Sequence, residues 1–151
     1  MNVIITGTKG WIGKIVGHTI QDAYPSLKLE GFDSGTCDYE EWYPQWHQFM
    51  WNYSNCRHDS YTPPAMIIHI GGVSDSNAGN ETCFESNFLP TVDIVDLAKK
   101  DNCKLLYFSS SSAINPTDPY GYSKYSAEQY IRKVMKPEKV CILQPLSLIH
   151  I

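Results

Sequence analysis

A serine run and a tyrosine–lysine pair carry the side chains in this sequence that are best suited to chemistry. Ser109–Ser112 follows an apolar stretch, and Tyr120 and Lys124 lie four positions apart at a plausible helix start. Residues with this spacing share a helix face, separated by about 6 Å along the axis. An ammonium group near a phenol favours the phenolate, so the tyrosine can move a proton near neutral pH while a serine hydroxyl holds the substrate oxygen. This set suits hydride transfer between a sugar carbinol carbon and a nicotinamide.

Sequence context selects this pair over another with the same spacing. Tyr24 and Lys28 are also four apart, but they lie on either side of Pro25 and lead into a strand, so they cannot share a helix face. Tyr120 instead directly follows Pro119, a residue favoured in a first helical turn. The alternative interpretation is structural: a flexible polar loop of serines, and tyrosines that pack on a surface helix.

A glycine-rich turn at the N-terminus predicts a phosphate-binding loop. The apolar stretch 3–6 leads into Gly7, Gly10 and Gly13, with Trp11 and Ile12 opening a helical pattern. Glycines let a ligand approach the main chain, and the N–H groups and positive dipole end of the following helix favour an anion such as a dinucleotide pyrophosphate. An ordinary tight strand-to-helix turn is the alternative.

An acidic residue follows at the distance that a dinucleotide-binding fold requires. Asp33 closes a second apolar stretch, 27–32, twenty positions after Gly13. Such a carboxylate hydrogen-bonds the adenosine ribose hydroxyls and repels the additional phosphate of NADP. The sequence therefore predicts NAD as the cofactor and NADP as the weaker candidate. Alternatively, Asp33 is a turn residue beside Ser34 and Gly35.

The remaining elements alternate in a way that predicts a doubly wound parallel sheet of the α/β, Rossmann-like class. Strands are expected at 65–70, 104–108 and 140–143, and helices at 88–99 and 120–135. The glycine loop, Asp33, Gly71, Gly72 and the serine run then all lie at carboxyl ends of strands, where ligands bind in such folds. The aromatic-rich segment 34–64 is interpreted as an amphipathic helix, with Pro44 where a helix could start, in preference to a stacking platform for a base or sugar.

Composition limits the class of protein. The 151 residues suit one domain, 1–151, and a net charge of −4 without a basic run argues against a nucleic-acid partner. No apolar run approaches the roughly 20 residues that span a bilayer, and the N-terminus lacks a signal-peptide pattern, so no membrane association and a cytoplasmic location are expected. The five cysteines lack paired spacing, which favours reduced thiols. His47 and His58 have no partner at ligand spacing, so no metal site is expected.

Taken together, these motifs resemble the extended short-chain dehydrogenase/reductases, and among them the NAD-dependent epimerase/dehydratase group that acts on nucleotide sugars. The resemblance extends over nearly the whole chain and rests on six features in order: the loop Thr6–Gly13, Asp33, the turn His69–Gly72, Asn87, the cluster Ser109–Ser111, and Tyr120 with Lys124. It implies that Ser111, Tyr120 and Lys124 are catalytic. It also implies a cofactor-binding set: Gly7, Gly10, Trp11, Ile12, Gly13, Asp33, Gly71, Gly72, Ser109, Tyr120 and Lys124.

The resemblance also narrows the reaction and leaves two hypotheses. Dehydratases of this group carry Asp-Glu after the catalytic hydroxyl residue, whereas Ser112-Ala113 stands here, so epimerisation or simple oxidation and reduction is favoured. Ser111 and Tyr120 are closer in sequence than in the family, and Gln144 and Ser147 replace an expected arginine and asparagine. The substrate domain is expected to be largely absent.

The first hypothesis is therefore an NAD-dependent nucleotide-sugar epimerase or oxidoreductase. The second is a truncated NAD-binding module without turnover. The resemblance places helix contacts of a homodimer near Phe88 and Tyr120, and exposed apolar faces make self-association an expectation.

Overall fold

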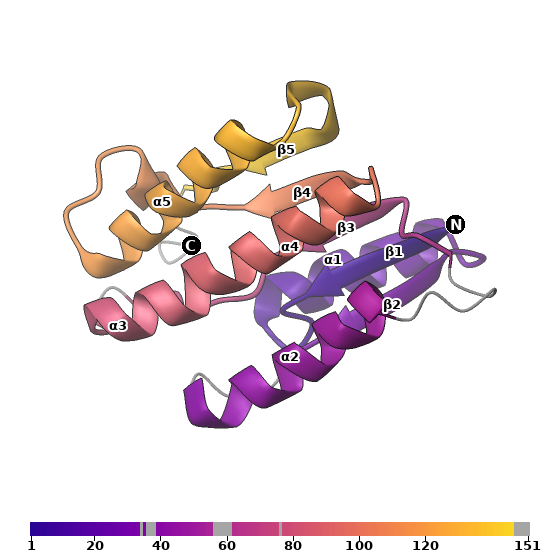
Figure 1. Cartoon of the computed structure of the whole chain (residues 1–151), viewed down its shortest axis with the longest axis horizontal. Coiled ribbons are helices and arrows are strands. Elements are labelled where there is room, and N and C mark those ends of the chain that lie inside the picture. The colour runs from indigo at the N-terminus through magenta and orange to yellow at the C-terminus, as the bar shows by residue number, and fades with distance from the viewer. Residues whose placement is uncertain (34, 36–38, 56–61, 76, 147–151) are drawn as a thin grey trace.

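A sheet of five parallel strands lies at the centre of the molecule (Figure 1). The computed structural model describes residues 1–33, 35, 39–55, 62–75 and 77–146. The strands are β1 (Asn2–Thr6), β2 (Lys28–Phe32), β3 (Met66–His69), β4 (Lys104–Phe108) and β5 (Val140–Leu143). Their order across the sheet is β2-β1-β3-β4-β5, and every neighbouring pair is parallel. The predicted doubly wound α/β class is confirmed.

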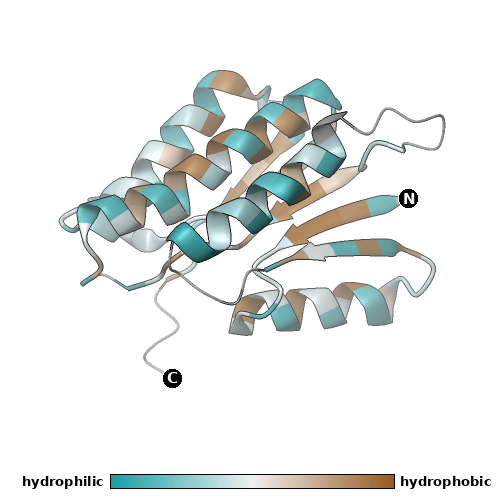
Figure 2. Cartoon of the chain, turned by 60° about the horizontal axis from the view of Figure 1, so that its bottom comes forward, coloured by the Kyte–Doolittle hydropathy of each residue, from teal (hydrophilic) through white to brown (hydrophobic). Residues whose placement is uncertain are grey.

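Helices follow the strands and cover both faces of the sheet. They are α1 (Trp11–Ala23), α2 (Tyr39–Asn55), α3 (Asn80–Cys83), α4 (Leu89–Lys100) and α5 (Pro119–Val134). The chain moves to one side from β1 to β2 and to the other side from β3 onward, so the crossover helices fall on opposite faces. Helices α2, α4 and α5 pack on one face, and α1 packs on the other, with the apolar strands between them (Figure 2).

Each face of the sheet has its own hydrophobic cluster because side chains alternate along a strand. Ile4 and Ile67 point toward the three-helix side, where they join Ile94 and Ile131 from α4 and α5. The flanking residues of the same strands, Val3, Ile5 and Ile68, form the second cluster. Apolar residues of α1, Val16 and Ile20, pack against that second cluster. The central strands are therefore buried on both sides, as their continuous apolar sequences predict.

The aromatic-rich segment forms a helix that packs on the sheet, as the amphipathic interpretation predicts. Trp42, Trp46 and Met50 of α2 are buried in the larger cluster. The predicted helix start at Pro44 is wrong, because α2 begins at Tyr39 and contains this proline. Glu40 and Glu41 occupy the first turn instead, where carboxylates interact favourably with the helix dipole.

The helix expected at 88–99 is α4, within one residue at each end, and further helical turns precede it. Helix α3 starts at Asn80 and continues through a π-helical turn, Phe84–Phe88, directly into α4. The residues before 88, which form α3 and the π-helical turn, were not predicted as helix. By contrast, β4 and β5 have the predicted bounds.

The thiols of Cys83 and Cys103 are buried and that of Cys141 is exposed, and all three are free. The predictions made for Cys37, Cys56, His58 and Ser147 lie outside the described residues. Among the helices that the structure describes, none has the length and apolar character needed to cross a bilayer.

The attachment of α2 to the sheet can be tested through Trp46. Its indole Nε1 donates a 2.7 Å hydrogen bond to Asp93 Oδ2 on α4, and its ring is 3% exposed. Trp46→Phe removes this bond from a partly buried carboxylate, so we expect the free energy of unfolding to fall by about 1–3 kcal/mol. Trp51→Phe, on the 54% exposed ring of the same helix, is the control and should change it by less than about 0.5 kcal/mol. Equal losses in urea titrations of both variants would contradict this account.

Candidate functional site

The first part of the site is the close approach of two glycine turns at the ends of β1 and β3. These strands are neighbours at the point where the strand order reverses, which is where doubly wound folds bind ligands. Gly7 has a φ of +77°, and a Cβ added to it would lie 2.7 Å from the Gly71 nitrogen. A Cβ on Gly13 would lie 1.9 Å from the Gly7 carbonyl oxygen. Only glycine therefore lets α1 begin directly against the turn that leaves β1.

The N-terminus of α1 lies at this turn, and no acidic or capping side chain of α1 balances the positive end of its dipole. No side chain caps Gly10, and the first turn of α1 carries no acidic residue. Its backbone N–H groups and dipole therefore favour an anion. The surrounding glycines leave the space that a pyrophosphate needs, so these residues fit a dinucleotide.

Asp33 is hydrogen-bonded to the backbone of the glycine turn after β1 and to the backbone of the loop after β2. Its Oδ2 accepts a 2.7 Å hydrogen bond from the Lys9 backbone N–H, and its Oδ1 accepts a 2.8 Å bond from that of Gly35. Each carboxylate oxygen retains a second lone pair that can accept from a ligand hydroxyl. Asp33 therefore joins the loop after β1 to the loop after β2 and still presents a negatively charged acceptor.

A buried polar network links the two glycine turns to the helices behind them. Thr6 Oγ1 accepts from the backbone N–H groups of Ile70 and Gly71, both at 3.2 Å, and lies 2.7 Å from His69 Nδ1. The Thr91 hydroxyl, 3.1 Å from His69 Nε2, donates to the Asn87 carbonyl oxygen at 2.6 Å. These directions assign the proton of a neutral imidazole to Nε2. Burial, with the charge of Lys124 nearby, lowers the pKa of His69 to about 3.

The serine run and α5 form the opposite wall. Ser109 follows β4 directly. Ser111 begins a short 3-10 helix, Ser111–Ala113, and the Ser110 side chain caps it by accepting a hydrogen bond from the Ser112 backbone N–H. Helix α5 begins at Pro119 because the Asp118 carboxylate accepts a 2.7 Å bond from the Gly121 N–H. The first turn of α5, which carries Tyr120, is thereby placed beside the serines.

One cavity of about 960 Å³ joins these parts. Every residue predicted for the site lines it except Lys124; the lining set comprises Gly7, Gly10, Trp11, Ile12, Gly13, Asp33, Gly71, Gly72, Ser109, Ser111 and Tyr120. Trp42 and Trp46, which pack in the larger hydrophobic cluster as predicted, also line this cavity. The roles of these residues remain predictions, but the chain does bring them to one cavity.

Lys124 lies behind that cavity and not in its wall. The side chain is buried, its Nζ donates a 3.3 Å hydrogen bond to the Phe108 carbonyl oxygen, and it lies 5.3 Å from the ring centroid of Tyr107. Burial lowers the pKa of Lys124 to about 8. The ammonium group therefore contacts the end of β4, immediately before the serine run.

Sequence reasoning missed Glu128, a buried carboxylate on α5. It accepts hydrogen bonds from Ser109 and Gln144, and it forms an ion pair with Arg132. Its spacing from Lys124 could have revealed it in the sequence, because residues four apart lie one turn apart on the same helix face.

Comparison with known families agrees with this arrangement. The model of the NAD dependent epimerase/dehydratase family matches residues 3–149, nearly the whole chain. The chain belongs to this family. No curated protein sequence is significantly similar to it. The resemblance predicted from the motifs is thereby confirmed at the level of the family.

Solved structures of several sugar-nucleotide enzymes share the fold. A dTDP-4-dehydrorhamnose reductase from Yersinia enterocolitica superposes with a TM-score of 0.72 at 19% identity, over 96% of this chain and 52% of that one. The UDP-glucuronic acid 4-epimerase from Bacillus cereus, solved with NAD, gives 0.71 at 16% identity, over 97% and 56%. A dTDP-4-dehydrorhamnose reductase from Bacillus anthracis, solved with NADP, gives 0.68 at 18%, over 96% and 53%. This epimerase/dehydratase-family chain thus spans about half the length of these structures.

The glycine contact can be tested with two substitutions one turn apart in α1. Gly13→Ala forces a methyl group against the Gly7 carbonyl, so we expect a less stable protein that no longer binds a dinucleotide. Gly17→Ala is the matched control, because its Cβ meets only Leu29 Cδ2 at 3.9 Å. That substitution should leave binding unchanged and raise stability by up to about 1 kcal/mol. Thermal unfolding and calorimetric titration measure both effects, and equal behaviour of the two variants would refute the steric account.

The burial of Lys124 predicts a pH dependence of stability. Its pKa is lowered to about 8 in the folded protein from 10.5. The unfolded chain therefore binds the proton more tightly, and the Lys124 contribution to stability rises with pH between these two values. We expect wild type to gain up to roughly 3 kcal/mol relative to Lys124→Met from pH 7 to pH 10. A pH-independent difference in urea unfolding would show that Lys124 titrates as an exposed lysine does.

Proposed function

We propose that this chain binds a nicotinamide adenine dinucleotide in the cavity between the ends of β1 and β3. The observation that carries the proposal is the glycine contact, since backbone at Gly7, Gly13 and Gly71 leaves room for a pyrophosphate at the N-terminus of α1. The family to which the chain belongs supports it.

NAD is the preferred cofactor in this proposal, with NADP as the weaker ligand. Asp33 is fixed by two backbone N–H groups, so its charge stays at the position where ribose hydroxyls bind and an additional phosphate is repelled. Lys9 lies on the same rim, with its Nζ close to Gly35. Its ammonium group is carried on a flexible arm and offsets this repulsion only in part.

The reaction that we propose is epimerisation or oxidation and reduction at a sugar carbon of a nucleotide sugar. The bound nicotinamide would supply the redox chemistry by exchanging a hydride with that carbon. Tyr120 moves the proton of the sugar hydroxyl, and the Ser111 hydroxyl donates a hydrogen bond to the same oxygen. Lys124 lies behind them, where its Nζ donates a hydrogen bond to the Phe108 carbonyl oxygen.

The proposed substrate class rests on the family of this chain and on the enzymes whose solved structures share its fold. Two of the structures reported above are reductases of a dTDP-linked sugar, and one is a UDP-glucuronic acid 4-epimerase. Dehydration is disfavoured because Ser112 and Ala113 supply neither acid nor base after Ser111. The second candidate is a cofactor-binding module without turnover, whose function would need only the glycine turns and Asp33.

Calorimetric titration with NAD and with NADP tests the cofactor. We expect micromolar NAD binding that weakens at least about tenfold in Asp33→Ala, because a charged hydrogen-bond acceptor is lost. Asp22→Ala, which removes an exposed carboxylate from α1 and changes the net charge equally, is the control and should bind as wild type does. Absence of binding by either cofactor would overturn the proposal.

A further substitution, at Tyr120, separates the two candidate functions. Tyr120→Phe should keep NAD binding but lose turnover of dTDP- and UDP-sugars, followed by the absorbance of reduced nicotinamide and by NMR of the sugar. Binding without turnover in wild type would favour the module.

A further inference from the structure

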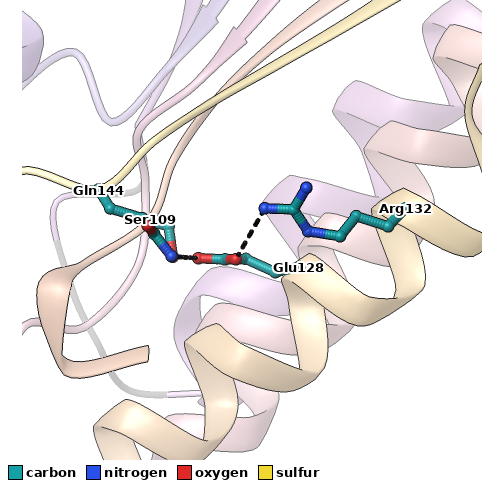
Figure 3. A network of polar contacts seen from close by, with 4 residues as sticks. All are labelled: Ser109, Glu128, Arg132 and Gln144. Carbon is teal, nitrogen blue, oxygen red and sulfur yellow. Dashed lines mark hydrogen bonds and ion pairs between the residues drawn. The ribbon is translucent and has the colours of Figure 1, made fainter. Parts of the chain in front are cut away.

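Glu128 is a buried carboxylate that joins three elements near the cavity. It lies on α5, with 4% of its surface exposed. Its Oε1 accepts hydrogen bonds from Ser109 Oγ at 2.5 Å and from Gln144 Nε2 at 2.7 Å. Its Oε2 lies 3.4 Å from Arg132 Nη2. Figure 3 shows the Ser109 and Gln144 side chains converging on one side of the carboxylate, with Arg132 on the other. A buried charge requires such partners, so the contacts of Glu128 fix the geometry around it.

The two donors mark the points where neighbouring strands end. Ser109 follows the last residue of β4, and Gln144 follows the last residue of β5. The main chain joins them as well, because the Ser109 N–H donates to the Leu143 carbonyl at 2.7 Å and the Ser111 N–H donates to the Pro145 carbonyl at 3.2 Å. One oxygen of Glu128 thus holds both segments that support Ser111.

Lys124, one helical turn before Glu128 on α5, also contacts the end of β4. Its Nζ donates to the Phe108 carbonyl, and Glu128 accepts from the next residue, Ser109. Two side chains of α5 therefore hold two consecutive residues of the chain just before the serine run. Tyr120 lies one turn before Lys124 on the same helix. These contacts join the chain just before Ser111 to the helix that carries Tyr120.

We propose that Glu128 is a positioning residue that holds the serine run against α5, so that Ser111 and Tyr120 act on one substrate oxygen. The proposal rests on the proposed function of Ser111 and Tyr120. It assigns Glu128 no contact with substrate or cofactor. The carboxylate acts through hydrogen bonds accepted at Oε1, and its charge is balanced at Oε2 by Arg132.

Two substitutions at position 128 separate hydrogen bonding from charge. Glu128→Gln keeps an oxygen that accepts from Ser109 and Gln144, and the 57% exposed Arg132 can turn toward solvent. Glu128→Ala removes both bonds and frees the serine run. We expect kcat to fall by about 10- to 100-fold in Glu128→Ala, as a misplacement of about 1 Å causes. Glu128→Gln should remain within about threefold of wild type, since both hydrogen bonds persist.

Arg132→Gln is the matched control, because it removes the ion pair and leaves the Oε1 contacts intact. It should retain wild-type turnover. Gln144→Met removes only the hydrogen bond from the end of β5 to Glu128, so it should give a smaller kcat loss than Glu128→Ala. If Glu128→Ala does not fold, Gln144→Met takes its place in the test. Each assay is run well below the melting temperature of its variant.

Hydrogen exchange gives a readout that does not depend on turnover. The amides of Ala113 and Ile114 bond to the Ser110 and Ser111 carbonyls at 3.0 and 3.1 Å. The exchange of these two amides should accelerate in Glu128→Ala, whereas the exchange of the β1 and α1 amides should not change. Unchanged exchange at 113–114, an equal rise across the whole sheet, or a turnover loss in Glu128→Gln equal to that in Glu128→Ala would each overturn the proposal. If wild type has no turnover, the proposed function fails, and the exchange pattern still decides whether Glu128 orders the serine run.

Discussion

The contact between the backbones of Gly7 and Gly71 is the constraint on which the site depends. It exists because β1 and β3 are paired neighbours and each ends in a glycine turn. A side chain at Gly7 would separate the two strand ends, and the N-terminus of α1 would move away with them. The ligand cavity, the rim at Asp33 and the serine wall are all arranged around this contact.

Two networks of buried polar groups fix the relative positions of the strand ends and helices around the cavity. Thr6, His69 and Thr91 connect the glycine turns to α4, and Glu128 connects the ends of β4 and β5 to α5. In an apolar interior a hydrogen-bonded group has few alternative arrangements, because leaving it unpaired is costly. The two networks therefore specify angles and distances, whereas the hydrophobic clusters on each face provide most of the driving force for folding.

The sequence predicted the fold class and the residues around the cavity because their signals are local. An apolar strand before Gly7, an acid at residue 33 and serines after β4 each follow a strand directly, and parallel strands bring such positions to one edge. The helix start suggested by Pro44 was wrong because this proline lies inside α2, which begins five residues earlier, at Tyr39. Glu128 was missed because its partners are remote in sequence, one of them sixteen residues away.

The pairing of β1 with β3 also determines when this protein can fold. The two glycines that meet at the centre of the cavity are separated by more than sixty residues, so their contact closes a long loop. During synthesis, β1, α1 and β2 leave the ribosome long before β3 does, and β1 meanwhile has an unpaired edge. The N-terminal unit must therefore remain partly open until about half of the chain has been made, and the cavity is completed only after that stage.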